Sequence, residues 1–234
     1  MKVLGIIPAR GGSKGVKNKN IRLLDGEPLL TYAINAAKES KLLTDYIVTS
    51  DDDNILKVAT SHNCKAHKRN VENAQDHSPI EDVVIELLNF LEKQYDLIVL
   101  LQPTAPLRTG LDIDNVISMF NINKTLNNVV SVIELEDIHP ARMYQINELL
   151  DLIPLNSEDE KTQRQKLSKV YLRNGCIYAT KTKAFLEHKS LILEDKKAYV
   201  MPQETWANID TERDFLLAEA LMKYLKSNKN ELFK

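Results

Sequence analysis

Short apolar runs alternate with helix-period segments through the first two-thirds of this chain. The runs at residues 3–7, 45–50 and 97–101 contain Val, Ile and Leu, whereas residues 28–40 and 79–94 carry apolar side chains at helical spacing. Strands that alternate with helices pair in parallel, since each helix carries the chain back to the start of the next strand. We therefore expect an α/β fold in which helices cover both faces of a mostly parallel sheet.

Weaker patterns complete the expected topology. Between residues 136 and 169 the sequence becomes polar and contains proline, which indicates an excursion from the sheet. We expect one domain, residues 1–234, with an inserted arm at about 136–169 that acts as a dimerisation hairpin. The remaining expected helices are residues 111–120 and 211–225, and the remaining expected strands are residues 64–68, 129–134, 170–180 and 199–202.

Charge and cysteine usage exclude several classes of protein. A formal net charge of −2 gives no basic face for nucleic acid, because the basic residues near the N-terminus belong to one loop. No secretion signal is visible, and no apolar run approaches the ~20 residues that span a bilayer, so we expect no membrane partner. Cys64 and Cys176 lie far apart without a redox motif, which predicts buried, reduced thiols in a cytoplasmic protein.

The most informative motif is the loop after the first expected strand. Residues 7–20 read Ile-Pro-Ala-Arg-Gly-Gly-Ser-Lys-Gly-Val-Lys-Asn-Lys-Asn. Glycines let backbone N–H groups approach phosphate oxygens, and the cations of Arg10, Lys14, Lys17 and Lys19 would neutralise those oxygens. The spacing matches neither a Walker loop nor the dinucleotide fingerprint Gly-x-Gly-x-x-Gly. The residues predict a polyphosphate site, with a flexible turn fringed by solvated lysines as the alternative.

This string resembles the N-terminal signature of the cytidylyltransferases that activate nonulosonic acids, the CMP-sialic acid synthetase family. Enzymes for the eight-carbon acid Kdo carry a different loop, whereas Ser13-Lys14-Gly15 and Lys19-Asn20 match the sialic type. The resemblance extends over nearly the whole chain. It implies a Rossmann-like nucleotidyltransferase sheet, a small dimerisation excursion in a homodimer, CTP and an acid sugar as substrates, and Mg²⁺ or Mn²⁺ as cofactor.

The resemblance assigns most nucleotide contacts to the first loop. Lys19 matches the lysine that lies against the α-phosphate, where negative charge grows as the bond to pyrophosphate breaks. Arg69 matches an arginine that faces the nucleotide, with ordinary surface as the alternative. The implied nucleotide-binding residues are Ala9, Arg10, Gly12, Ser13, Lys14, Asn20 and Arg69, and the implied catalytic residues are Arg10, Lys19 and Asp210.

Three later segments are implied to bind the acid sugar. Gln102 opens a Gln-Pro-Thr-Ala-Pro-Leu-Arg loop after a buried strand, and its amide suits the recognition of hydroxyl groups. Asn174 and Tyr178 belong to an Asn-Gly-x-Ile-Tyr strand, whose glycine indicates close approach of a ligand or backbone. Arg142 and Arg164 match basic positions directed at the substrate's carboxylate or acyl groups, in part across a dimer interface. The alternatives are a proline-shaped turn, a core tyrosine and solvated arginines.

The last motif, Trp-Ala-Asn-Ile-Asp-Thr at residues 206–211, is the expected metal site. Alternation along a short strand would place Asn208 and Asp210 on one face. Many family members carry two aspartates at this spacing as Mg²⁺ ligands, but the carboxamide of Asn208 contributes no charge. Asp210 is therefore the principal expected metal ligand, and Asn208 a neutral one. Capping of the last helix by Asp210 or Thr211 is an alternative that is compatible with metal binding.

Taken together, the residues and the resemblance predict an enzyme that converts CTP and a 2-keto nonulosonic acid into the CMP-sugar and pyrophosphate. No histidine or carboxylate stands out as a general base, and the sequence does not distinguish sialic, legionaminic and pseudaminic acids. The alternatives are a cytidylyltransferase for another acid sugar such as Kdo, and a nucleotide-binding regulatory module that has lost catalysis. Asn208 keeps the second alternative open.

Overall fold

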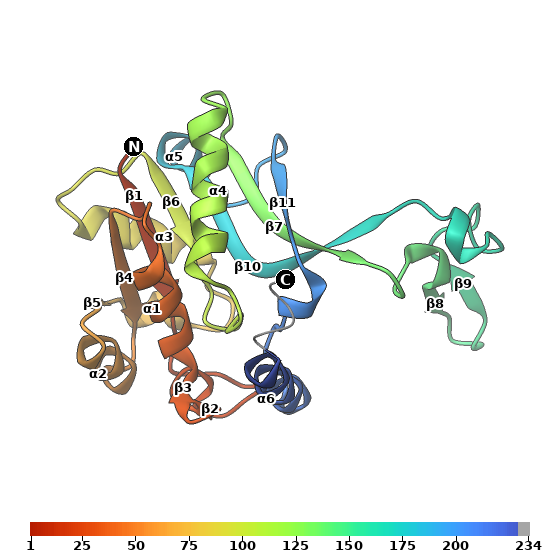
Figure 1. Cartoon of the computed structure of the whole chain (residues 1–234), viewed down its shortest axis with the longest axis horizontal. Helices are drawn as coiled ribbons and strands as arrows, with labels where there is room; N and C mark the ends of the chain where they lie inside the picture. The colour runs from red at the N-terminus through yellow and green to blue at the C-terminus, as the bar shows by residue number, and fades with distance from the viewer. Residues whose placement is uncertain (229–234) are drawn as a thin grey trace.

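A seven-stranded sheet forms the centre of the protein in the computed structural model, which describes residues 1–228 (Figure 1). The strand order is β11-β7-β10-β6-β1-β4-β5. Among the described strands of this sheet, only β10 runs antiparallel to its neighbours, which confirms the prediction of a mostly parallel sheet. The strands are β1 (Val3–Pro8), β4 (Asp45–Ser50), β5 (Lys65–Lys68), β6 (Leu97–Leu100), β7 (Asn128–Leu135), β10 (Val170–Lys181) and β11 (Lys197–Met201).

Helices cover both faces of this sheet, as the sequence predicts. One apolar cluster joins one face of the sheet to α1, α2 and α4, and a second joins the opposite face to α3 and α5. Strand β1 divides its side chains between them: Val3 and Ile7 enter the first cluster, and Leu4 and Ile6 enter the second. The helices are α1 (Leu29–Glu39), α2 (Asp53–Ser61), α3 (Ile80–Phe90), α4 (Gly110–Ile122), α5 (Thr182–His188) and α6 (Glu212–Ser227).

A third apolar cluster fixes the C-terminal helix against the N-terminal loop. Phe215 and Met222 of α6 pack with Val16 of the glycine-rich loop and with Ile209. Helix α6 begins with a capping box between Thr211 and its third residue, Asp214. Burying an apolar side chain of this size stabilises the fold by about 1.5–3 kcal/mol. Helix α6 is therefore held against the loop that follows β1.

Three expectations about local structure differ from the observed fold. Helix α3 ends at Phe90 rather than at residue 94, because Leu91 already has an extended backbone. Helix α5 follows β10 directly and carries too short an apolar pattern to be recognised in the sequence. The strand expected over residues 206–211 is wrong: this segment is irregular, and the N–H of Ile209 donates to the carbonyl of Thr104 at 2.9 Å.

The excursion at residues 136–169 extends away from the sheet as an arm (Figure 1). It contains the two-stranded pair β8 (Tyr144–Ile146) and β9 (Leu152–Pro154), together with short 3₁₀ turns. Its tip exposes apolar side chains, with Leu149 82% and Leu150 80% exposed. A separate small hairpin, β2 (Leu23–Leu24) and β3 (Glu27–Pro28), precedes α1.

Candidate active site

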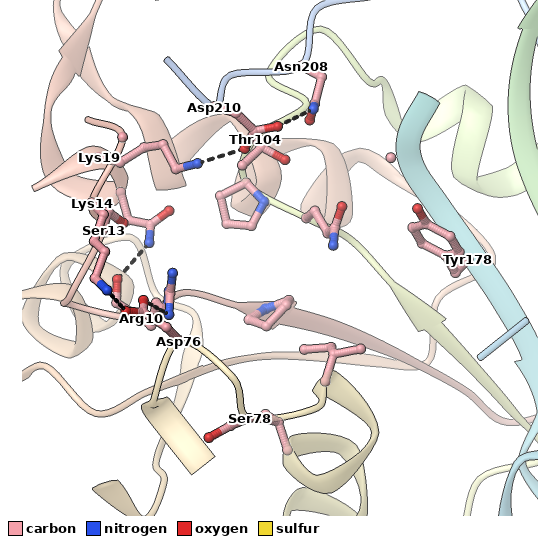
Figure 2. A pocket seen from close by; sticks show the side chains of 18 of the residues that line it. Arg10, Ser13, Lys14, Lys19, Asp76, Ser78, Thr104, Tyr178, Asn208 and Asp210 are labelled. Atoms are coloured by element: carbon pink, nitrogen blue, oxygen red, sulfur yellow. Dashed lines mark hydrogen bonds and ion pairs between the residues drawn. The ribbon is translucent and has the colours of Figure 1, made fainter. Parts of the chain in front are cut away.

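The predicted polar loops meet at one edge of the sheet. Strands β1, β4, β5 and β6 are parallel, so the segments that follow them lie at their shared carboxyl edge, where open α/β sheets bind ligands. A cavity of about 730 Å³ opens there (Figure 2). The predicted site residues that line it are Arg10, Ser13, Lys14, Lys19, Asn20, Arg69, Gln102, Asn174, Tyr178, Asn208 and Asp210.

Two of the residues that are predicted to bind the nucleotide are absent from the cavity lining. Ala9 is buried, and its N–H donates to the carbonyl of Thr49 at 3.0 Å. Gly12 lies in the loop with no other part of the protein within 4 Å of a Cβ built on it. The open space around Gly12 leaves its backbone accessible to a ligand.

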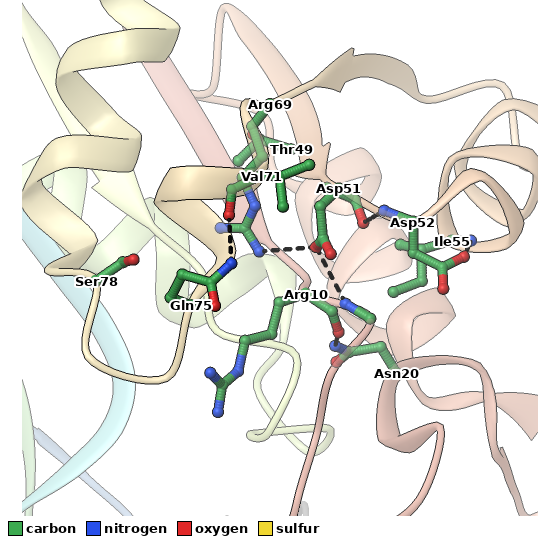
Figure 3. Close-up of polar contacts among 12 residues, drawn as sticks. Arg10, Asn20, Thr49, Asp51, Asp52, Ile55, Arg69, Val71, Gln75 and Ser78 are labelled. Atoms are coloured by element: carbon green, nitrogen blue, oxygen red, sulfur yellow. Dashed lines mark hydrogen bonds and ion pairs between the residues drawn. The ribbon is translucent and has the colours of Figure 1, made fainter.

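An acidic turn holds the glycine-rich loop in place (Figure 3). The N–H of Gly11 donates to Asp51 at 3.1 Å, and a Cβ on Gly11 would lie 2.8 Å from the carboxylate of Asp52. The side chain of Asn20 donates to the carbonyl of Arg10 at 2.9 Å and so closes the loop from its other end. Gly11 thus packs closely against the acidic turn, and a larger residue there would displace the side chain of Asp52.

Arg69 is buried in the wall of the cavity and is not an ordinary surface residue. Its guanidinium lies 3.5 Å from Asp51 (Figure 3), and its Nε has no hydrogen-bond partner among the described residues. Burial lowers the pKa of Arg69 from its usual value, although Asp51 opposes that shift. Asp51 therefore connects the glycine-rich loop to Arg69, which directly follows β5.

Asp76 was not predicted from the sequence, and the structure places it beside the cations of the glycine-rich loop. Its carboxylate lies 2.7 Å from the guanidinium of Arg10 and also pairs with Lys14 (Figure 2). The hydrogen bond from Lys14 lowers the pKa of Asp76, and Arg10 adds to the effect. Asp76 follows the short 3₁₀ turn Val71–Ala74, in a polar stretch without a recognisable motif.

Lys19, Asp210 and Asn208 form a linked group where the loop after β1 meets the segment before α6. The ammonium of Lys19 donates to the carbonyl of Ile209 at 2.7 Å and to the carboxylate of Asp210 at 3.1 Å. The amide of Asn208 donates to the other oxygen of Asp210 at 2.7 Å (Figure 2). A Cβ on Gly15 would lie 2.0 Å from the carbonyl oxygen of Asp210, so only glycine fits at that position.

Asp210 is suited to share a divalent cation with a substrate but not to enclose one. Its side chain is 64% exposed and lines the cavity. No group of three or more His, Cys, Asp or Glu side chains is arranged for a metal within residues 1–228. Mg²⁺ commonly uses one or two carboxylates together with substrate phosphates and water, which fits this donor set.

The opposite side of the cavity is polar and brings three segments together. Gly175 has a φ of 74°, and a Cβ on it would lie 3.3 Å from the amide oxygen of Gln102 and 3.4 Å from that of Asn208. Asn174 uses its amide oxygen within the protein, accepting from Ser131 at 2.6 Å. Tyr178 faces the cavity (Figure 2), and burial raises the pKa of its hydroxyl.

Arg142 and Arg164 lie outside this cavity in the single chain. Both line a separate hollow of about 450 Å³ at the base of the arm. Arg164 pairs with Asp137 at 2.8 Å, and Arg142 donates to the carbonyl of Thr162 at 3.2 Å. Their predicted approach to a substrate across a dimer interface stays a prediction.

Two further arginines lie near the wall formed by Gln102 and Gly175, and the sequence analysis did not assign them to the site. Arg173 lines the cavity next to Asn174. Arg108, the last residue of the Gln-Pro-Thr motif, is fully buried and donates to the carbonyls of Gln102 at 3.1 Å and Cys176 at 2.8 Å. Burial lowers the pKa of Arg108 to about 10. Motif spacing alone does not distinguish a buried or cavity-lining arginine from one that is only solvated.

The fold is a Rossmann-like α/β sheet with a polar cavity at its carboxyl edge. The structure titled CMP:2-keto-3-deoxy-manno-octonic acid synthetase complexed with CTP has a TM-score of 0.74, at 17% sequence identity, over 96% of this chain and 99% of that chain. The 4-diphosphocytidyl-2C-methyl-D-erythritol synthase of Anaerococcus prevotii has a TM-score of 0.65, at 15% identity, over 95% of this chain and 96% of that chain. At these identities the similarity establishes the fold.

Sequence comparisons establish the family more narrowly. Residues 4–231 match the family model described as cytidylyltransferase. The post-translational flagellin modification protein B of Campylobacter coli is 30% identical over 95% of this chain and 95% of its own length. The pseudaminic acid cytidylyltransferase of Campylobacter jejuni is 31% identical over 95% of this chain and 97% of its own. This chain belongs to the cytidylyltransferase family.

One group of relatives is longer. The N-acylneuraminate cytidylyltransferase of Streptococcus agalactiae serotype V is 31% identical over 92% of this chain but over only 52% of its own length. This chain therefore spans about half the length of that relative. No helix within residues 1–228 has the length and apolar character required to cross a bilayer.

Proposed function

We propose that this protein transfers the cytidylyl group of CTP to a 2-keto nonulosonic acid and releases pyrophosphate. The observation that carries the proposal is the division of the cavity into two chemically different ends. Four cations, Arg10, Lys14, Lys19 and Arg69, lie on the segments that follow β1 and β5, and the other side carries amide and hydroxyl groups and a single cation, Arg173. A polyphosphate and a polyhydroxylated sugar require these two kinds of surface.

The anomeric hydroxyl of the sugar would attack the α-phosphorus of CTP in line with the leaving pyrophosphate. The new bond joins the hydroxyl oxygen to the α-phosphorus, while the bond between that phosphorus and the β-phosphate oxygen breaks. Lys19 and Arg10 would stabilise the negative charge that moves onto the phosphate oxygens. No histidine lines the described cavity, and the hydroxyl proton would pass to water.

Mg²⁺, or Mn²⁺ in its place, would be held by Asp210 and by oxygens of the triphosphate. The bound ion would neutralise phosphate charge and hold the chain of phosphates in one geometry. Asn208 would direct the carboxylate of Asp210 through its 2.7 Å hydrogen bond. The proposal therefore needs only one protein carboxylate at the ion.

We also propose a cytoplasmic homodimer in which the arm contacts a second copy. The exposed leucines at the arm tip support this contact, because isolated apolar side chains of this size are stabilised when they are covered. Such a dimer would allow Arg142 and Arg164 to approach the substrate of a partner subunit. Sialic, legionaminic and pseudaminic acids are the candidate substrates, since relatives at about 30% identity carry names for each of them.

A pyrophosphate-release assay tests this proposal. The purified protein is given CTP and Mg²⁺ with each of the three nonulosonic acids and, separately, with Kdo. We expect turnover with at least one nonulosonic acid and little with Kdo. Binding of CTP without turnover of any acid would favour a regulatory module instead, and preferred turnover of Kdo would reassign the substrate class.

A further inference from the structure

The cations of the large cavity differ in whether they already have a carboxylate partner. Arg10 and Lys14 pair with Asp76, Lys19 pairs with Asp210, and Arg69 lies beside Asp51. The fifth cation that lines the cavity is Arg173. Within residues 1–228, the guanidinium of Arg173 forms no ion pair and no side-chain hydrogen bond, unlike the other four. A cation without an internal partner is free to bind an external anion.

Arg173 also lies at the acceptor end rather than at the phosphate end. It immediately precedes Asn174 and Gly175 in β10, and Gly175 approaches Gln102. The other four cations follow the ends of β1 and β5, at the nucleotide end of the cavity. An acid sugar carries its carboxylate on the carbon that bears the reacting hydroxyl, so it requires a positive group on the acceptor side.

The register of β10 changes directly after Arg173, in the part of the strand that lines the cavity. The pairing of β10 with β7 is regular up to Arg173, which lies opposite Val132, and resumes at Tyr178 after an irregularity. Such a bulge changes the direction of side chains and commonly occurs next to active sites. The guanidinium of Arg173 lies 6.0 Å from the centre of the Tyr178 ring, where a cation–π contact can hold it. The ring thus supports a planar cation beside the sugar-binding wall.

We propose that Arg173 binds the carboxylate of the acid-sugar acceptor within the same chain. The assignment rests on the proposed function and specifies how that function selects an acid. A guanidinium offers two parallel N–H donors that match the two oxygens of a carboxylate, which a lysine does not. The arm arginines are less suited within one chain, since Arg164 already pairs with Asp137 at 2.8 Å.

The test compares an acid acceptor with its neutral carboxamide in pyrophosphate-release assays. The wild-type protein should prefer the acid, and Arg173→Gln should lose that preference by about tenfold to a hundredfold, the range for a hydrogen bond to a charged group. The loss should fall on the KM for the acid and leave the KM for CTP unchanged. Arg173→Lys should retain part of the preference. Arg213→Gln, an exposed arginine on α6 outside the cavity, is the matched control.

The outcomes separate this assignment from the proposed function. If Arg173→Gln still prefers the acid over the amide as strongly as the wild type, the assignment is overturned. Loss of the preference in Arg164→Gln but not in Arg173→Gln would also overturn it, in favour of the arm of a second copy. Absence of turnover by the wild type with every acid would instead overturn the proposed function, and with it this assignment. The thermal midpoint of Arg173→Gln should match the control, because the side chain is exposed.

Discussion

At the scale of single residues, Asp76 forms ion pairs with the cations that are proposed to bind the triphosphate. Its carboxylate pairs with Arg10 and Lys14, so it competes with phosphate oxygens for the same donors. Asp76 is 39% exposed, and ion pairs of this exposure contribute little stability. The contact is therefore weak enough to open when a nucleotide arrives.

Replacing Asp76 with Asn should strengthen CTP binding. Removing one negative charge removes both the competition and the repulsion of the triphosphate, which predicts an increase in affinity of about twofold to tenfold. Isothermal titration with CTP, without acceptor, measures the effect, and the exposed Asp82→Asn on α3 is the control. Weaker binding by Asp76→Asn would mean that Asp76 assists the nucleotide instead of competing with it.

Position 208 is the second position at which a change of charge can be tested. In Asn208→Asp, a second carboxylate would lie beside Asp210, and the pair should attract Mg²⁺ more strongly than one carboxylate does. We expect half-maximal turnover at a lower Mg²⁺ concentration. Asn208→Ala, which removes the hydrogen bond without adding charge, controls for local disruption. An unchanged Mg²⁺ titration for Asn208→Asp would place position 208 away from the ion.

At the scale of secondary-structure elements, a buried cation joins the loop after β6 to β10. Arg108 donates to the carbonyls of Gln102 and Cys176, while its Nε and one terminal nitrogen have no partner among the described residues. An unpaired buried charge is costly to the folded state. The benefit we infer is that Arg108 fixes the spacing between two walls of the acceptor side.

Substituting Arg108 with Met should loosen those walls without affecting the nucleotide end. We expect a KM for the acid that rises by about tenfold or more, since two hydrogen bonds to carbonyls are lost, with an unchanged KM for CTP. Arg108→Lys should restore part of the affinity by reaching one carbonyl. Equal losses toward both substrates, accompanied by a lower thermal midpoint, would indicate that Arg108 only stabilises the fold.

The elements also explain what the sequence could predict. Strands β1, β4 and β6 and helices α1 and α3 carry strong local periodicity, so their positions follow from the sequence within a few residues. Most of the predicted cationic loop lines the cavity because it immediately follows β1. Asp76 and Arg173 could not be predicted, since their roles depend on which distant segments lie beside them. Residues 206–211 were wrongly expected to be a strand, because alternation does not reveal a backbone held by a loop carbonyl.

At the scale of the whole molecule, the arm exposes several large apolar side chains to solvent. Leu149, Leu150, Ile146 and Leu152 are all at least 60% exposed, and they lie within one short hairpin. A β-hairpin of this size is at most marginally stable by itself, so contact with a second copy would stabilise it. The proposed homodimer would cover the exposed apolar side chains and stabilise the hairpin.

A double change, Leu149→Glu with Leu150→Glu, should convert the proposed dimer into a monomer. Burying two charges at an apolar interface is strongly unfavourable, so the molar mass measured by light scattering should fall by half. Leu216→Glu, an equally polar change at an exposed position of α6, should leave the mass unchanged. A wild-type protein that is already monomeric would contradict the proposal, as would a double variant that stays dimeric.

The contact between Gly15 and the backbone of Asp210 has a consequence for biosynthesis. The glycine-rich loop cannot take up its final shape until the segment around Asp210 has also been translated, because that segment forms one of its walls. A nascent chain stalled before residue 209 would contain every described strand of the sheet but would lack one wall of the cavity. The cavity wall at the glycine-rich loop therefore depends on a contact between two segments that lie far apart in the sequence.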